Sequence, residues 1–201
     1  MSIEGCLRLV VELKTNFILG QAIVKNGSLV SPLHIFPDKN IEMEFCLLSK
    51  GDSVNSDGEM ILFEVVKSYP QHDLMIGRVF GKNLVKENSP IEFDLSNMHS
   101  TKILASLIPN SIGKIELIKK ECRFVKNILL PERAISTDTT ACHRRNARFQ
   151  LYTGWISKGM SGSLILNSEN LSLAGIAIGN LLSDEKTFVG SSLREKLSRN
   201  Y

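Results

Sequence analysis

The sequence contains few cysteines and almost no excess of charge. Four of its 201 residues are cysteines, and they lie far apart, with neither a C-x-x-C pair nor the spacing of metal ligands. This distribution argues against a cysteine-rich zinc site or a disulfide framework, and it predicts reduced thiols. The formal net charge is only +3, from 24 basic and 21 acidic residues, which is too slight an excess to indicate a nucleic-acid-binding domain.

Long apolar runs are also absent. The longest apolar stretch, Leu173 to Leu182, has about ten residues, whereas a membrane-spanning helix needs roughly 20. The opening residues Met1 to Glu4 lack the basic start and apolar stretch of a signal peptide. We therefore expect a cytoplasmic protein that makes no contact with a membrane. The apolar fraction of 43% and the charged fraction of 22% are typical of a globular chain and exclude a disordered or fibrous one.

Six apolar runs of strand length occupy the first half of the chain. They span 6–13, 17–24, 28–30, 42–48, 60–66 and 74–80. The dipeptide Asn26-Gly27 between the second and third runs is a strong hairpin signal, because both residues tolerate the positive φ of a tight turn. A spacing of roughly 8–12 residues between turns favours an antiparallel sandwich or barrel over alternating strands and helices.

A polar stretch from about 81 to 100 predicts a connection between two halves. Beyond it, strand-like runs resume at 103–108, 115–118, 124–130, 147–152, 164–166 and 173–178. Only the last residues, Ser191 to Tyr201, have the pattern of a helix, with charges around Leu193 and Leu197. We therefore predict an all-β fold with two similar halves and a short C-terminal helix.

Ser161 lies in a segment suited to nucleophilic chemistry. The sequence Gly159-Met160-Ser161-Gly162 places glycines on both sides of a serine just before a strand, and glycine permits the sharp turn that exposes a hydroxyl. Successive N–H groups of such a turn can converge on a developing oxyanion. Glycine-serine loops are common, so the segment taken alone also fits an ordinary loop.

A serine nucleophile needs a base, and the chain has four histidines. His34 follows a strand that ends near Val30, in a short turn where a neutral imidazole could accept the hydroxyl proton. Asp73 directly precedes an apolar strand and could hold the imidazole in the required tautomer. Structural roles remain open for both residues, as a buried histidine and as a turn-forming aspartate.

Other polar residues compete for these roles. Asp38 and Asp52 are alternative carboxylates, but each lies among turn residues with no strand directly behind it. We expect His72 and His99 at the protein surface.

The segments around these residues resemble the motifs of chymotrypsin-like serine proteases. The segment 29–34 is similar to their strand-then-histidine motif, 73–79 to their aspartate motif and 159–163 to their nucleophile loop. The stretch 175–179 resembles the strand that lines the substrate backbone. The chain order His, Asp, Ser is that of the chymotrypsin group. The short intervals between the motifs are most similar to viral polyprotein-processing enzymes and small intracellular members.

The resemblance implies a catalytic triad. It makes His34 the general base, Asp73 the residue that orients it and Ser161 the nucleophile. The N–H groups of Gly159 and Ser161 would form the oxyanion hole.

The implied fold has two six-stranded antiparallel β-barrels with the triad in the cleft between them. Residues 1–82 would form the N-terminal barrel with the histidine and the aspartate. Residues 83–100 would form the connection, and 101–201 the C-terminal barrel with the serine and the terminal helix.

The resemblance also implies a polypeptide substrate bound in extended form, with no metal or cofactor. Trp155 and Ile156 fall where the floor of the pocket for the residue before the cut is set. Ile176, Ala177 and Ile178 fall where the substrate backbone lies. Ala177 stands where viral relatives specific for Gln or Glu often carry a histidine, so we expect a small or apolar residue before the cleaved bond.

Two positions depart from the family pattern. Leu33 replaces the small residue that usually precedes the histidine, and Met160 replaces the aspartate that secreted members carry before the nucleophile. No Ile-Val-Gly-Gly-like start is present either. Met160 and the missing start together predict an active site formed on folding, without the activation cleavage of secreted members.

The leading functional hypothesis is a serine endopeptidase that acts through an acyl-enzyme and processes a viral polyprotein in the host cytoplasm. The alternatives are a cellular or bacterial regulatory protease and a catalytically weakened protease-like fold that binds peptide or RNA. Arg144, Arg145 and Arg148 belong to a basic run that is either a solvated loop or a weak nucleic-acid contact.

Overall fold

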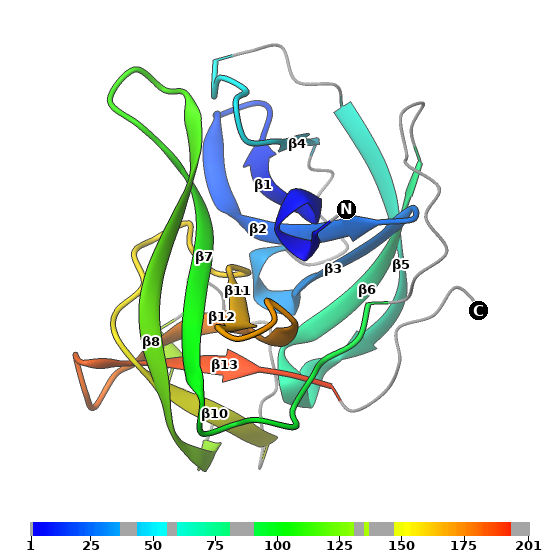
Figure 1. Cartoon of the computed structure of the whole chain (residues 1–201). Helices are drawn as coiled ribbons and strands as arrows, with labels where there is room; N and C mark the ends of the chain where they lie inside the picture. The colour runs from blue at the N-terminus through cyan, green and yellow to red at the C-terminus, as the bar shows by residue number, and fades with distance from the viewer. Residues whose placement is uncertain are drawn as a thin grey trace.

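The computed structural model of the chain describes residues 2–36, 44–55, 60–80, 91–130, 135–136 and 147–193. Within these ranges the protein consists of β-strands, turns and three 3₁₀ helices of three or four residues each. No helix in the described ranges is long and apolar enough to cross a membrane. The predicted all-β class is therefore confirmed (Figure 1).

The first six strands form a closed barrel in the order β1-β2-β3-β6-β5-β4, with every neighbouring pair antiparallel. Their bounds are β1 (Leu7–Glu12), β2 (Phe17–Lys25), β3 (Ser28–Pro32), β4 (Phe45–Leu48), β5 (Met60–Tyr69) and β6 (Leu74–Phe80). The hairpin predicted at Asn26-Gly27 joins β2 to β3, and both residues have positive φ, at 56° and 75°. This is the backbone that a two-residue hairpin turn needs.

The remaining strands form a seven-stranded antiparallel sheet in the order β11-β7-β8-β10-β13-β12-β9. Their bounds are β7 (Thr101–Pro109), β8 (Ile115–Leu130), β9 (Ile135–Ser136), β10 (Ala147–Thr153), β11 (Leu164–Asn167), β12 (Leu173–Leu181) and β13 (Thr187–Ser191). Strand β11 also pairs with β12, so the sheet curls until strands near its two ends meet. The prediction of two barrels is thus confirmed in part: the first half is a closed barrel and the second half is an antiparallel sheet.

Two elements of the second half differ from the sequence prediction. The runs 115–118 and 124–130 belong to one strand, β8, because the charged residues between them at 119–121, although all exposed, pair with 103–105 of β7. Ser191, expected to begin a helix, is the last residue of β13, a strand whose five residues are all buried. The rest of the predicted helix from 194 onward, and residues 83–90 of the predicted connection, lie outside the described residues.

Apolar side chains fill both sheets and the space between them. One cluster lies within the first barrel and includes Val10, Leu29 and Met75. A second cluster lies within the second sheet and includes Tyr152 and Phe188. The largest cluster draws on both halves; its members include Leu9, Ile23, Leu107, Ile115 and Leu164. Because burial of apolar surface is the main force that stabilises folded proteins, this shared cluster holds the two sheets together.

Backbone hydrogen bonds also join the two halves. The hairpin between β7 and β8 reaches the loop after β4, where Gly51 N–H donates to Ile115 O at 2.9 Å and Ile115 N–H donates to Asp52 O at 2.8 Å. Figure 1 shows this long green hairpin extending from the second sheet to lie beside the first barrel. At the other end of the interface, Ser191 Oγ donates to His72 O at 2.6 Å. These contacts fix how the loops of the first barrel face the second sheet.

Candidate active site

His34 and Asp73 are brought together by the pairing of β3 with β6. Pro32 at the end of β3 lies opposite Leu74 at the start of β6. His34 lies in the 3₁₀ turn η2 (Leu33–Ile35) just after β3, and Asp73 lies just before β6. The antiparallel register therefore makes these two residues neighbours, although they are far apart in the sequence.

Both oxygens of the Asp73 carboxylate contact His34. Its Oδ1 accepts the His34 backbone N–H at 3.0 Å, and its Oδ2 lies 2.6 Å from His34 Nδ1. The aspartate is completely buried and the histidine almost so. A buried carboxylate is stable only when its oxygens are hydrogen-bonded. Binding of Nδ1–H to Oδ2 leaves Nε2 as the acceptor nitrogen of a neutral ring.

The backbone at Asp73 directs this carboxylate inward. The turn η3 (Pro70–His72) ends at Asp73, whose N–H donates to Pro70 O at 3.1 Å. Asp73 itself has left-handed backbone angles, φ 51° and ψ 40°, a conformation that aspartate adopts more readily than most residues. The chain thereby reverses direction between β5 and β6 within residues 70–73.

Ser161 lies in a tight turn between residues 157 and 163, just before β11. Within the turn, Met160 N–H donates to Ser157 O and Ser163 N–H donates to Met160 O, each at 3.0 Å. Gly162 N–H donates to Ala177 O of β12 at 2.8 Å. Gly162 has φ 95°, and a Cβ there would lie 1.9 Å from the Gln21 carbonyl oxygen. Only glycine fits this position, for both reasons.

The turn that carries His34 and the turn that carries Ser161 meet over β2. A Cβ placed on Gly20 would lie 2.7 Å from Ser161 O and 2.9 Å from a side-chain carbon of Ile35, the residue after His34. Gln21, next along β2, donates its N–H to Ser161 O at 2.7 Å. The turn with His34 and the turn with Ser161 therefore both approach β2 at Gly20. In this structure the Ser161 hydroxyl donates to Ile178 O of β12 at 2.9 Å.

The amides of the serine turn alternate in their hydrogen bonding. The N–H groups of Met160, Gly162 and Ser163 all have backbone acceptors. Within the described part of the chain, no acceptor is found for the N–H groups of Gly159 and Ser161. Gly159 has φ 85°, which turns the backbone between these two amides. A pair of amides left without acceptors beside a serine hydroxyl is suited to bind an oxyanion.

The predicted substrate-contact residues divide into two kinds. Trp155 is 48% exposed, and Ile156 is buried. Ile176, Ala177 and Ile178 on β12 are completely buried in the apolar clusters. The main chain of Ala177 is bonded to the serine turn, through Gly162 N–H and Ser163 O. Ile178 O is the group that contacts the Ser161 hydroxyl.

Two polar residues near the serine turn were missed from the sequence. Gln21 on β2 is completely buried and contacts the turn. Asn180 on β12 accepts the Ile156 N–H at 3.0 Å and donates to Ile156 O at 2.8 Å, so it joins the segment before the serine turn to β12. The only sequence signal for either residue is a polar side chain within an apolar strand.

The two departures from the family pattern have local structural explanations. Met160 is buried in the core of the second sheet, and its sulfur accepts the Ser157 N–H at 3.2 Å. It therefore stabilises the serine turn by packing and by this contact. Leu33 is partly buried and packs against the apolar cluster of the first barrel.

The competing residues lie in other settings. Asp52 is exposed and accepts the Ser49 N–H at 2.7 Å, as a turn residue does. His99 is exposed, with its ring 5.6 Å from that of Phe124, and His72 is partly buried. Arg148 is exposed on β10. Asp38, Arg144 and Arg145 lie outside the described residues.

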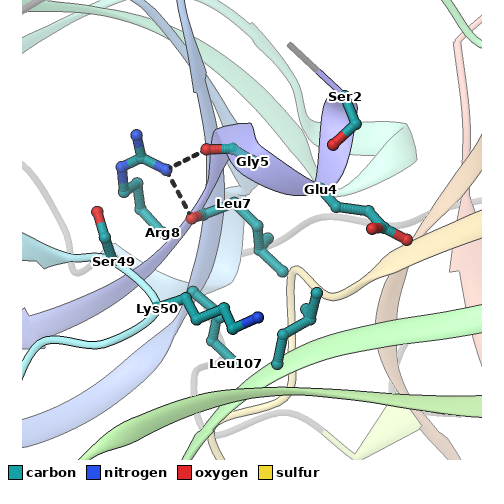
Figure 2. Close-up of a pocket in the computed structure, with 9 residues that line it drawn as sticks. Ser2, Glu4, Gly5, Leu7, Arg8, Ser49, Lys50 and Leu107 are labelled. Atoms are coloured by element: carbon teal, nitrogen blue, oxygen red, sulfur yellow. Dashed lines mark hydrogen bonds between the residues drawn. The ribbon is translucent and has the colours of Figure 1, made fainter.

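A cavity of about 410 Å³ lies elsewhere, beside the N-terminal turn, and shares no lining residue with the serine turn or the His34 turn. Figure 2 shows residues that line it, with the Arg8 guanidinium donating to the carbonyl oxygens of Gly5 and Leu7 at 2.7 and 2.8 Å. The guanidinium is therefore held by its own strand and turn.

A closed barrel followed by a second antiparallel sheet, with the His-Asp pair on the first and the serine turn on the second, defines the chymotrypsin-like protease fold of the PA clan. The fold expected from the sequence resemblance is confirmed. This fold is shared by serine and cysteine proteases of the chymotrypsin-like group.

Comparison with solved structures supports this assignment. The active form of the Rv3671c protease from M. tuberculosis has a TM-score of 0.65 and 13% identity, covering 94% of this chain and 77% of that one. The tobacco vein mottling virus protease has a TM-score of 0.64 and 12% identity, covering 99% and 82%. The HRV-C 3C protein with rupintrivir has a TM-score of 0.55 and 9% identity, covering 95% and 93%. At these identities the shared property is the fold. No protein-family model and no curated protein matches the sequence.

Proposed function

We propose that this protein is a serine endopeptidase whose triad is His34, Asp73 and Ser161. The observation that carries the proposal is the completely buried Asp73 carboxylate, which lies 2.6 Å from His34 Nδ1. The turn that carries His34 meets the Ser161 turn over Gly20. A buried carboxylate that holds one ring nitrogen prepares the other to act as a base.

The proposed reaction has two displacement steps. Ser161 Oγ exchanges the Ile178 carbonyl for His34 Nε2 as its acceptor, transfers its proton to that nitrogen and attacks the substrate carbonyl carbon. The carbonyl oxygen becomes an oxyanion held by the N–H groups of Gly159 and Ser161. His34 then protonates the leaving amine as the C–N bond breaks, which leaves an acyl-enzyme. Water, deprotonated by His34, then attacks the acyl carbon, and His34 returns the proton to Ser161 Oγ as the acid is released.

The proposed substrate is a polypeptide in extended conformation with a small or apolar residue before the cleaved bond. Support for the extended form comes from Ile178, whose carbonyl oxygen lies next to the serine hydroxyl and can accept a substrate N–H. Trp155 and Ile156 bring no charge to the neighbouring segment, which favours an uncharged residue before the cut.

The finer proposal is the processing of a viral polyprotein in the host cytoplasm. Its support is the short spacing of the three motifs and the likeness in fold to a plant-virus protease and to the HRV-C 3C protein. A bacterial regulatory protease is the alternative, and the likeness in fold to the Rv3671c protease favours it.

A second candidate function is a protease-like module that binds peptide without efficient turnover. The observation in its favour is the Ser161 hydroxyl, which donates to Ile178 O in this structure. The RNA contact proposed for the basic run has Arg148 as its described member, an exposed residue on β10.

Reaction with a fluorophosphonate probe tests the proposal. We expect wild-type protein to be labelled and Ser161→Ala to be unlabelled, because the probe forms its bond with an activated serine oxygen. Ser157→Ala is the matched control, since Ser157 is an exposed serine of the same turn, and it should be labelled normally. Labelling that persists in Ser161→Ala would contradict the proposal. Folded wild-type protein that binds peptides but never reacts would favour the binding module.

A further inference from the structure

Gln21 is a completely buried polar side chain in the middle of an apolar strand. Its neighbours on β2, Ala22 and Ile23, belong to the apolar clusters. Burial of a carboxamide without partners costs several kcal/mol (roughly 2–7). Its partners therefore indicate why a glutamine occupies this position.

The Gln21 carboxamide pairs with β7 of the second sheet. Its Nε2 donates to Leu107 O at 2.9 Å, and its Oε1 accepts the Leu107 N–H at 2.8 Å. The side chain thus satisfies both main-chain groups of Leu107, in the way a neighbouring strand would. This pairing joins the first barrel to the second sheet directly behind the serine turn.

The same residue contacts the serine turn at three points. Its Nε2 also donates to Gly159 O at 3.2 Å. Its backbone N–H donates to Ser161 O at 2.7 Å. Its carbonyl oxygen packs against Gly162 so closely that a Cβ there would lie 1.9 Å away.

The contact with Gly159 bears on the oxyanion-binding amides. Glycine rotates more freely about its backbone bonds than other residues, so the Gly159 N–H needs an external constraint to keep its direction. The bond from Gln21 Nε2 to Gly159 O holds the peptide plane between Gly159 and Met160, and so restrains the glycine on the side that follows its Cα. On the far side of the turn, Met160 O accepts Ser163 N–H at 3.0 Å and Ser163 Oγ at 2.6 Å. Because the peptide group is planar and trans, the Ser161 N–H points in the direction opposite to Met160 O. The two bonds to Met160 O therefore fix the direction of the Ser161 N–H.

We propose that Gln21 is a positioning residue for the oxyanion-binding amides, and that its carboxamide holds the 159–162 turn in the conformation needed for turnover. This inference rests on the proposed function. Gln21 touches neither substrate nor reacting atoms in the mechanism above, and it acts through Gly159 and Ser161. The competing explanation is a purely structural link between the two halves, which would affect stability alone.

Hydrolysis of p-nitrophenyl acetate separates these two roles. We expect Gln21→Met, which keeps the length of the side chain but loses its polar groups, to lower kcat by about 10- to 100-fold while KM changes less than about twofold. Fluorophosphonate labelling should slow in parallel. Asn167→Leu is the control, because Asn167 is another buried carboxamide of the second sheet, bound to Asp94 O and Ser172 Oγ and not to the serine turn. It should lower Tm and leave kcat unchanged.

Gln21→Glu supplies a second test through its pH profile. An ionised glutamate keeps an acceptor for Leu107 N–H but has no donor for Gly159 O, whereas a protonated carboxyl can donate. Burial raises the pKa of a carboxyl group towards neutrality. We therefore expect the ratio of variant kcat to wild-type kcat to rise as the pH falls. The pH profile can be measured even if only a small fraction of the variant folds. The rate is then divided by the concentration of protein that the fluorophosphonate probe labels.

The outcomes distinguish the inference from the function on which it rests. An active wild-type enzyme whose Gln21 variants lose Tm but keep kcat, with a flat pH ratio, would overturn the positioning role and leave the proposed function standing. A folded wild-type protein without esterase activity or probe labelling would overturn both.

Discussion

Asp73→Asn is the change whose effect the structure specifies most closely. Oδ1 of the carboxylate accepts the His34 backbone N–H at 3.0 Å, and Oδ2 lies 2.6 Å from His34 Nδ1. An asparagine must keep its oxygen on the backbone N–H, since its NH₂ group cannot accept a hydrogen bond. The NH₂ group is then directed at Nδ1 and makes this nitrogen an acceptor. The imidazole therefore carries its proton on Nε2, where it can no longer take one from Ser161.

The expected loss in kcat is about 10⁴-fold, the effect that the wrong histidine tautomer has in serine proteases with this triad. This corresponds to about 5 kcal/mol of lost transition-state stabilisation. The assay is steady-state hydrolysis of p-nitrophenyl acetate, with circular dichroism to verify the fold. Asp52→Asn is the control, because Asp52 is an exposed turn aspartate bound to the Ser49 N–H, and its kcat should match wild type. A value of kcat for Asp73→Asn within tenfold of wild type would refute this reasoning.

Two further predictions concern the packing of the serine turn and the response to acid. Gly162→Ala places a Cβ 1.9 Å from the Gln21 carbonyl oxygen at φ 95°, so we expect a loss of several kcal/mol (about 2–4) in the free energy of unfolding in urea. Gly113→Ala, at φ 79° with open space around it, should cost about 1 kcal/mol, and equal losses for the two would be inconsistent with a clash. The pKa of Asp94 is lowered from 3.8 to about 2, first by the hydrogen bond from the Ser96 hydroxyl and then by that from the Ser172 hydroxyl. Its contribution to stability is therefore complete above pH 3.8 and is lost as the pH falls towards 2, and an acid titration of Asp94→Asn should lack this part of the loss.

The positions of most strands could be predicted because their signals are local. Alternation of apolar residues and turn-forming dipeptides such as Asn26-Gly27 act over a few residues, and the structure contains that hairpin. Prediction failed where local sequence and burial disagree. The charged residues 119–121 are exposed but pair with 103–105 of β7, so they do not interrupt β8. Strand β13 was missed because its short apolar core, Phe188-Val189, is followed by a glycine and serines that resemble the start of a helix.

The candidate site was predictable to a similar extent. His34 and Asp73 could be paired from their places beside two strands, and the register of β3 with β6 confirms that they meet. The contact of Gln21 with Leu107 spans 86 residues of sequence. No local sequence pattern predicts such a contact, since it depends on how the two sheets pack together.

The sequence alone determined the β-rich composition, the turns and the kinds of side chain available at positions 34, 73 and 161, because hydrophobic periodicity and turn chemistry are properties of neighbouring residues. Only the tertiary structure decided that the His34 and Ser161 turns meet over Gly20 and that Gln21 reaches both β7 and the serine turn. The physical reason is that these contacts form between residues of the two halves, and their geometry follows from the apolar packing that brings the halves together.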